Sequence, residues 1–225
     1  MNPVSKETTY QAVKATIQTR KTMKVIGDPN SPVEITKEVA SLHQPRILEA
    51  IAEAGWAPFH YDRNHEKIAE PWRFHVLWHQ ECRVIASRFH EWFENVKPSN
   101  KLPPMLSACG SLILVNWIPQ SEPGHTNEKM VQVDEEHLAA TSAAVQNLLL
   151  LLTAGGYGTY WSSGGQFRTA TMFEKLNIPS QEKLLAAVFV EFPESFEQPL
   201  QRLAGKHRAN RASSDQWTRI IEAVS

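Results

Sequence analysis

Two clusters of basic side chains near opposite ends of the chain are the residues best suited to chemistry. Arg20, Lys21 and Lys24 follow the first expected helix, and Lys206 and Arg208 stand near the C-terminus. A phosphomonoester needs several cations, and an arginine can grip its oxygens through two parallel hydrogen bonds. Separately, each cluster has the composition of a solvated face. If the fold brings the two ends together, the clusters form an anion site.

A glycine run at residues 155–158 has some of the composition of a dinucleotide-binding loop, but its setting argues against that use. A dinucleotide fingerprint follows a strand and opens a helix, whereas these glycines end a helix and lead to a strand. A helix cap explains them fully. The nearby Ser162-Ser163-Gly164 lacks the Gly-x-Ser-x-Gly pattern, so a hydrolase triad has no anchor. We assign no general acid, base or nucleophile.

Histidines are the other candidate ligands. His75 and His79 are expected on one face of a strand, and His60 and His65 share a loop. No carboxylate or thiol stands at a metal-ligand spacing from them, and the chain has no His-Glu-x-x-His motif. We therefore expect no metal site.

The elements that must position these groups begin with a helix over residues 8–19, where Thr8 and Gln11 have capping-box spacing. A second helix is expected to start at Pro45, a good first-turn residue, and to end near Gly55. The loop that follows, residues 59–71, is long and polar, and such loops are often functional or mobile.

The middle of the chain alternates between strands and helices. Residues 72–79 alternate in polarity, which predicts a half-buried strand, and a helix is expected over residues 82–95. Residues 111–117 are almost all apolar and predict a buried strand. No repeat or linker divides the chain, so we expect a single α+β domain over residues 1–225.

A long helix opening at Asp134 is expected after a surface loop over residues 119–133, and from residue 138 to 154 it is apolar almost all round. It is either a central core helix or a helix at a subunit interface. A strand is expected after the glycines, at residues 159–163, and another, buried strand at residues 184–192. A closing helix is predicted from a capping box, Ser213 and Gln216, and from an apolar stripe of Trp217, Ile220, Ile221 and Val224.

Composition excludes several classes of protein. The 225 residues are 42% apolar and 21% charged, as in a soluble globular protein. The net charge of −1 disfavours nucleic acid as a partner, and we expect no apolar run long enough to cross a membrane. The start of the chain is too polar for a signal peptide, and two cysteines make no disulfide framework. A cytoplasmic location is therefore expected.

The chain resembles the FMN-dependent nitroreductase family in several blocks that stand in the family's order. Residues 20–24 resemble its Arg-x-Ser/Thr-x-Lys/Arg segment, and residues 206–208 resemble its late Lys-x-Arg. Further blocks are Ala57-Pro58-Phe59-His60, Pro71-Trp72-Arg73-Phe74, the helix and glycine loop over residues 138–164, and Asn177-Ile178-Pro179-Ser180-Gln181-Glu182. The chain departs from the family pattern at Glu70, Glu191 and a longer loop over residues 61–69.

The resemblance implies a homodimer with a central, mostly antiparallel sheet flanked by helices, a long buried interface helix, and FMN bound between the subunits. It implies that the phosphate is bound by Arg20 and Arg208 with Lys206 nearby, that Lys21 and Thr22 contact the phosphate and ribityl region, and that Lys24 lies by flavin N1 and O2. It also implies that a main-chain N–H of the turn at Trp161, Ser162, Ser163 and Gly164 reaches flavin N5. His60 either approaches the site from the other subunit or is a loop histidine bonded to the backbone.

The implied activity is a ping-pong reaction in which NADH or NADPH delivers a hydride and a nitroaromatic, quinone or activated alkene then accepts the electrons. Alternatives stay open: a flavin-binding or regulatory module, or a diverged flavin-dependent oxidase.

Overall fold

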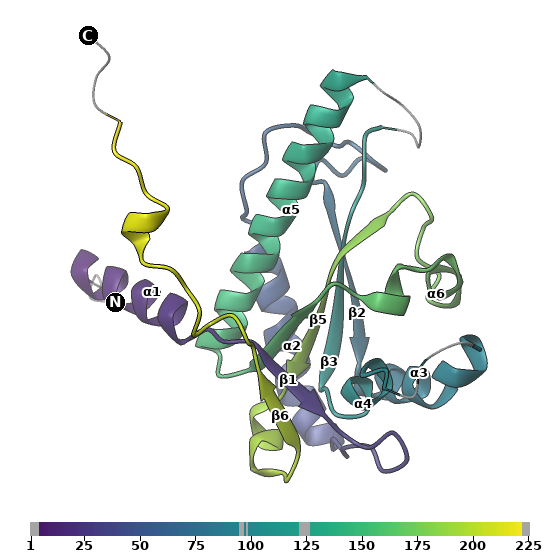
Figure 1. Ribbon diagram of the computed structural model, residues 1–225. Helices are drawn as coiled ribbons and strands as arrows, with labels where there is room; N and C mark the ends of the chain where they lie inside the picture. Colours follow the sequence, from purple (N-terminus) through teal and green to yellow (C-terminus); the bar gives the residue numbers. More distant parts are fainter. Residues whose placement is uncertain (1–4, 95–96, 98, 122–126, 222–225) are drawn as a thin grey trace.

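Four antiparallel strands in the order β2-β3-β5-β4 form the central sheet of the computed structural model, which describes residues 5–94, 97, 99–121 and 127–221 (Figure 1). A separate pair, β1 and β6, runs antiparallel beside β4. The strands are β1 (Met23–Ile26), β2 (Trp72–Trp78), β3 (Ser111–Trp117), β4 (Gly158–Ser162), β5 (Lys183–Glu191) and β6 (Gln201–Ala204).

Helices cover both faces of this sheet (Figure 1). The α-helices are α1 (Lys6–Thr19), α2 (Lys37–Ala54), α3 (His79–Trp92), α4 (Leu102–Leu106), α5 (Glu128–Ala154) and α6 (Ala170–Lys175), and short 3₁₀ turns span Gly165–Arg168, Pro193–Glu197 and Ser214–Gln216. The predicted α+β class with an antiparallel sheet is confirmed.

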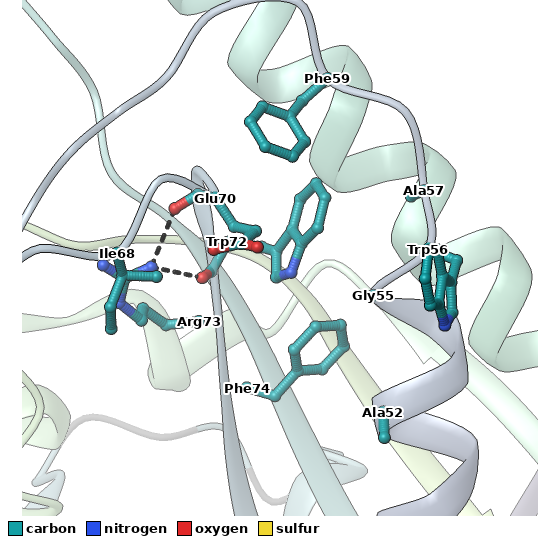
Figure 2. Close-up of a pocket in the computed structure, with 10 residues that line it drawn as sticks. All are labelled: Ala52, Gly55, Trp56, Ala57, Phe59, Ile68, Glu70, Trp72, Arg73 and Phe74. Carbon is teal, nitrogen blue, oxygen red and sulfur yellow. Dashed lines mark hydrogen bonds between the residues drawn. The ribbon is translucent and has the colours of Figure 1, made fainter.

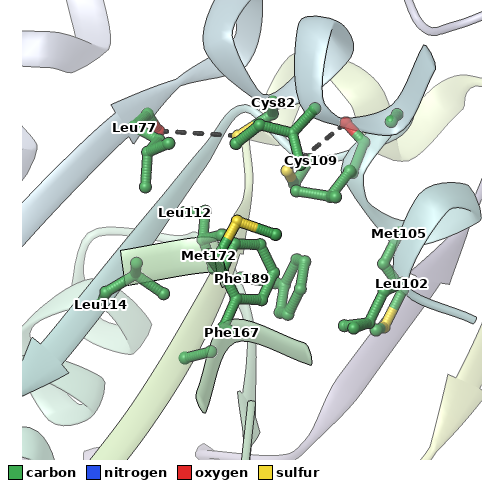
Figure 3. Packing of buried hydrophobic residues seen from close by; sticks show 14 of the residues in the cluster. Leu77, Cys82, Leu102, Met105, Cys109, Leu112, Leu114, Phe167, Met172 and Phe189 are labelled. Carbon is green, nitrogen blue, oxygen red and sulfur yellow. Dashed lines mark hydrogen bonds between the residues drawn. The ribbon is translucent and has the colours of Figure 1, made fainter. Parts of the chain in front are cut away.

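Strand β3 is the centre of two hydrophobic layers. Its even-numbered Leu112 and Leu114 join the cluster beneath α3, α4 and α6, which Figure 3 shows from close by. Its odd-numbered Ile113 and Val115 join the cluster beneath α2 and α5. Because successive side chains point to opposite faces, a strand covered on both faces needs an unbroken apolar run. The prediction of a buried strand at residues 111–117 is confirmed.

Several predicted helix starts were wrong because other residues cap the helices. Ser5 caps α1, so the helix begins before Thr8. Thr36 caps α2, and Pro45 lies inside that helix instead of opening it. Asn127 caps α5, so the end of the expected loop is already helical, while residues 122–126 of that loop lie outside the described residues.

Asp134 does not open α5 but lies inside it. Its carboxylate accepts hydrogen bonds from the main-chain N–H of Gln120 and the hydroxyl of Ser121, and so holds the incoming chain against the helix. One turn further on, His137 is 1% exposed and donates from Nε2 to the carbonyl of Tyr61 at 3.1 Å. The polar start of α5 thus fixes two loops.

The boundary between β2 and α3 also differs from expectation. The strand ends at Trp78, and His79 is the first residue of α3, so His75 and His79 do not share a strand face. His75 instead bonds Glu182 at 2.6 Å. The helix ends at Trp92, three residues before the expected end at Asn95, which lies outside the described residues.

The predicted closing helix is absent from the described C-terminal residues, where only the turn Ser214–Gln216 forms. Trp217, Ile220 and Ile221 are 71–87% exposed, and Val224 lies outside the described residues. An amphipathic stripe needs a surface to pack on before a short helix is stable, and this segment extends away from the body of the chain (Figure 1).

Helix α5 corrects one further expectation, because it is long and apolar enough to cross a membrane by length and composition alone. Core helices of soluble proteins pass the same test. The buried side chains of α5, among them Val145, Leu148 and Leu152, pack on α2 and the sheet. Val131, Leu138 and Leu151 of the same helix are 37–44% exposed, so within one chain α5 is not buried all round.

Candidate functional site at the junction of the two chain ends

The pairing of β1 with β6 brings the two basic clusters together. Met23 lies opposite Ala204, and the N–H of Gly205 donates to the carbonyl of Thr22 at 3.2 Å. A Cβ on Gly205 would lie 2.9 Å from the Cβ of Thr22, so only glycine permits this approach. The segment that carries Arg20 therefore runs beside the segment that carries Arg208.

The guanidinium groups of Arg20, Arg208 and Arg211 lie together and are called the Arg20 cluster below. Arg208 donates to the main-chain carbonyls of Arg20 and Gln18, which joins the last part of the described chain to the end of α1. Burial lowers the pKa of the half-buried Arg20, and the like charges of Arg211 and Arg208 lower it further. Arg211 was missed by the sequence analysis, although a third arginine three residues after Arg208 was a signal for it.

No carboxylate neutralises these arginines in the part of the chain that the structure describes. The four ion pairs there are His43–Glu194, His65–Glu66, His75–Glu182 and Arg202–Glu191. Like charges that repel one another are held together most readily when an anion lies between them. The donor set thus fits a phosphate group.

Two members of the N-terminal segment point to different surroundings. Lys24 on β1 holds its ammonium 4.5 Å from the ring centroid of Tyr160 on β4. Lys21 instead lines a separate cavity of about 340 Å³, together with Met23 and Phe196. Alternate residues of an extended segment point to opposite sides, which accounts for the separation. A bridge between Thr22 and Thr159 connects the segment to β4.

The turn after β4 requires glycine. Gly164 has a φ of +101°, and a Cβ there would lie 2.4 Å from Cδ2 of Leu184. Its N–H already donates to Oγ of Ser162 at 3.2 Å. Within the described residues, its neighbours Ser163 and Gly165 are both exposed, and the N–H of Ser163, which directly follows β4, has no such acceptor. The side chain of Trp161 packs against the α2 and α5 layer, so its side of β4 faces away from Lys24.

His60 lies at the β2 edge of the sheet, away from the Arg20 cluster at the β4 edge. Strand β2 and the loop before it lie at the edge opposite β4, and His60 is exposed there. In the described part of the chain no hydrogen bond joins His60 to the Arg20 cluster. Within one chain, His60 therefore does not lie near the Arg20 cluster.

A cavity of about 590 Å³ lies between the end of α2 and β2, with Phe59, the residue before His60, in its wall, and Figure 2 shows the side chains that line it. Four of its ten lining residues are aromatic, and Phe59 is edge-on to Trp72 at 5.6 Å between ring centroids. Arg73 donates to the carbonyls of Glu70 and Trp72 at 3.0 and 2.7 Å, so the loop before β2 is tied to the strand.

The departure at Glu191 has a structural explanation. Glu191 ends β5, is 3% exposed, and accepts two hydrogen bonds from Arg202 of β6 at 3.0 and 2.7 Å. Burial raises the pKa of Glu191, while Arg202 opposes the rise. The ion pair fixes β6 to the sheet, and β6 in turn holds β1.

A sequence model of the nitroreductase family matches residues 35–190. The chain belongs to the nitroreductase family. Outside that match lie the segments that carry the two basic clusters. Within the described residues, no group of three or more His, Cys, Asp and Glu side chains gathers as a metal site would require.

Individual relatives agree with this membership. The Bacillus subtilis protein YfhC, whose name describes an NAD(P)H nitroreductase, is 25% identical over 154 residues, which are 66% of this chain and 73% of that protein. A nitroreductase-like protein from Bacillus cereus is similar in structure over 99% of this chain and 100% of its own, with a TM-score of 0.66 and 20% identity. The FMN-dependent nitroreductase NfnB from Mycobacterium smegmatis, solved with NADPH, covers 95% of this chain and 100% of its own, with a TM-score of 0.54 and 14% identity. At these identities the two structures support the fold.

Proposed function

We propose that this protein is an FMN-dependent oxidoreductase that takes electrons from NADH or NADPH and passes them to a small electron-poor acceptor in a ping-pong reaction. Nitroaromatics, quinones and activated alkenes are the acceptor classes. The observation that carries the proposal is the uncompensated Arg20 cluster in a chain of the nitroreductase family. The FMN dependence of NfnB and the name of YfhC support it.

The Arg20 cluster is the proposed phosphate site. Arg20, Arg208 and Lys206 would bind the phosphate oxygens, because a dianion favours charge-assisted donors over neutral ones. We add Arg211, whose charge already lowers the pKa of Arg20. Bound anion would relieve the repulsion among these groups, so binding should also strengthen the contact of Arg208 with the end of α1.

The remaining contacts follow the family resemblance. Bound FMN supplies hydride acceptance and donation at N5, which protein side chains do not provide. Lys24 would hold a positive charge by N1 and O2, where reduction leaves negative charge. Thr22 and Lys21 would contact the ribityl region, with Lys21 reaching it through its main chain or by turning out of its cavity. Ser163, in the turn with Trp161, Ser162 and Gly164, would offer its N–H to N5.

A second copy of the chain would complete the site. Helix α1 has no buried residue, and Tyr10, Val13 and Ile17 are 52–62% exposed on it. The C-terminal segment and α5 also expose apolar side chains. Solvent-exposed apolar surface of this extent favours association, so we propose a homodimer in which α5 lies at the interface. His60 and the aromatic cavity at the β2 edge would then approach the flavin of the other subunit.

The aromatic cavity suits a planar acceptor. Trp56, Phe59 and Phe74 line it, and flat rings gain most from offset or edge-on contact with such side chains. Catalysis would then rest on stacking and orientation, and no dedicated acid or base is required. Because Cys82 and Cys109 are both free thiols, we also propose a reducing compartment, the cytoplasm.

FMN binding and bleaching test the proposal. Arg20→Ala should weaken FMN binding by about 1–3 kcal/mol, the usual cost of losing a hydrogen bond to a charged group. Arg88→Ala, which removes an exposed arginine on α3, is the matched control and should bind as the wild type does. Equal affinities for the two variants would reject the phosphate role of Arg20.

Turnover is a separate measurement. Anaerobic NADH or NADPH should bleach the flavin band of the holoprotein, and an acceptor panel should restore it. A yellow protein that neither nucleotide bleaches would instead indicate a flavin-binding or regulatory module. A particle mass of one chain with bound flavin would contradict the shared site.

A further inference from the structure

The contact between Lys24 and Tyr160 lies beside the basic cluster and is not among the roles that the family resemblance implies. The ammonium lies 4.5 Å from the ring centroid, within the range of a cation–π contact. Both residues are half-buried. Within the described residues, no ion pair involves Lys24. The ring of a tyrosine, not a carboxylate, therefore holds this charge.

Tyr160 is itself held firmly. It lies in β4 opposite Phe189 of β5, and the two rings are nearly parallel, 27° apart in plane, with centroids separated by 6.1 Å. The Tyr160 ring also packs against the hydrophobic cluster beneath α3, α4 and α6. A lysine side chain has four rotatable bonds, so a fixed ring is needed to give its ammonium a defined position.

An aromatic holder has a chemical consequence that an acidic one lacks. A carboxylate beside Lys24 would cancel most of its charge at a distance of several ångströms. A ring face orients the ammonium through its quadrupole and leaves the net charge in place. Lys24 is thus fixed in direction and still fully able to stabilise a nearby negative charge.

We propose that Tyr160 is a positioning residue that fixes Lys24 and so favours reduced over oxidised flavin in this protein. The inference rests on the proposed function, in which Lys24 lies by flavin N1 and O2. Phe189 packs beside the ring, and the pairing of β1 with β6 holds the backbone of Lys24.

The test compares the reduction potential of bound FMN and the affinity for oxidised FMN in a set of variants. Tyr160→Leu removes the ring, and Tyr160→Phe keeps its face. Tyr160→Leu should lower the preference for reduced flavin by at most about three- to fivefold, because the loss cannot exceed the free energy of the half-buried cation–π contact that positions the ammonium. For a two-electron couple this ceiling is a fall of about 15–20 mV. Tyr160→Phe should keep the wild-type potential.

Two comparisons separate positioning from packing. In a Lys24→Gln background, Tyr160→Leu should change the potential no further, because the charge that it positions is gone. Trp92→Leu is the matched control, since it removes the ring beneath a different ammonium, that of Lys175 at 5.7 Å, and should leave the potential unchanged. Tyr160→Met serves if Tyr160→Leu does not fold.

The outcomes are distinct. An unchanged potential in Tyr160→Leu and Tyr160→Met, or the same fall in the Lys24→Gln background, would overturn the positioning role while leaving FMN binding intact. A wild-type protein that takes up no FMN would overturn the proposed function, and this inference with it.

Discussion

Replacing Arg202 by methionine should destabilise the protein through the charge that it leaves behind. Arg202 is 22% exposed in its side chain, whereas its partner Glu191 is 2% exposed. The guanidinium also donates to the carbonyls of Gln198 and Leu200 at 3.1 and 3.3 Å and to that of Ser195. Arg202→Met removes all of these hydrogen bonds and keeps most of the side-chain volume.

The size of the effect follows from burial. Removing one partner of a buried ion pair costs about 3–5 kcal/mol, and the partial exposure of Arg202 places this case at about 3 kcal/mol. For a chain of this length, each kcal/mol lowers the melting temperature by about 2–4 °C, so the expected fall is about 6–12 °C. Thermal and urea unfolding would both report it.

The pH dependence has a definite sign. Burial already raises the pKa of Glu191, and loss of Arg202 should raise it further. A carboxyl group whose pKa is higher in the folded than in the unfolded state opposes folding at high pH and ceases to oppose it once both states are protonated. The destabilisation should therefore be greatest near pH 8 and smaller near pH 5.

A double variant supplies the control. In Arg202→Met with Glu191→Gln no buried charge remains, so at least half of the lost stability should return at pH 8. Equal melting temperatures for Arg202→Met and the wild type at pH 8, or a loss as large at pH 5, would refute the reasoning.

Three further outcomes are expected. Gly164→Ala should cost about 1–3 kcal/mol in urea unfolding because of its positive φ and its approach to Leu184, and an unchanged midpoint would contradict this. Burial lowers the pKa of His137, so the folded protein should lose stability as the pH falls below about 6.5. His137→Gln should flatten that part of the profile between pH 7.5 and 5.5. The buried thiols of Cys82 and Cys109 should react with an aromatic disulfide reagent far more slowly in the native protein than in urea, and rapid native labelling of both would disprove their burial.

Patterns that depend on local burial were predictable from the sequence. The apolar run at residues 111–117 predicts a strand covered on both faces, and β3 is such a strand. The glycines at residues 155–158 predict the end of a helix, and α5 ends at Ala154 with Gly156 at a φ of +84°. Both features follow from backbone conformation and hydrophobic periodicity over a few residues.

Helix starts and the closing segment were less predictable because alternatives compete locally. Thr36 and Pro45 are both good residues for the first turn of α2, and the packing of the whole helix on the sheet favours the longer one. The stripe at residues 217–221 has helical spacing, yet in the described structure Trp217, Ile220 and Ile221 stay 71–87% exposed. Periodicity indicates which side a helix would bury. A short helix is stable only when tertiary contacts cover that side.

The sequence by itself determined which side chains carry the charge, since Arg20 and Arg208 can be read directly from it. Only the tertiary structure decided that these two arginines, 188 residues apart, meet beside β1 and β6, and that Arg211 joins them. The physical reason is that local patterns specify elements, whereas the meeting of distant segments depends on the strand pairing and buried contacts of the whole fold. The contact of Lys24 with the ring of Tyr160 was likewise decided by the tertiary structure, because the two residues lie on strands β1 and β4, which are far apart in the sequence.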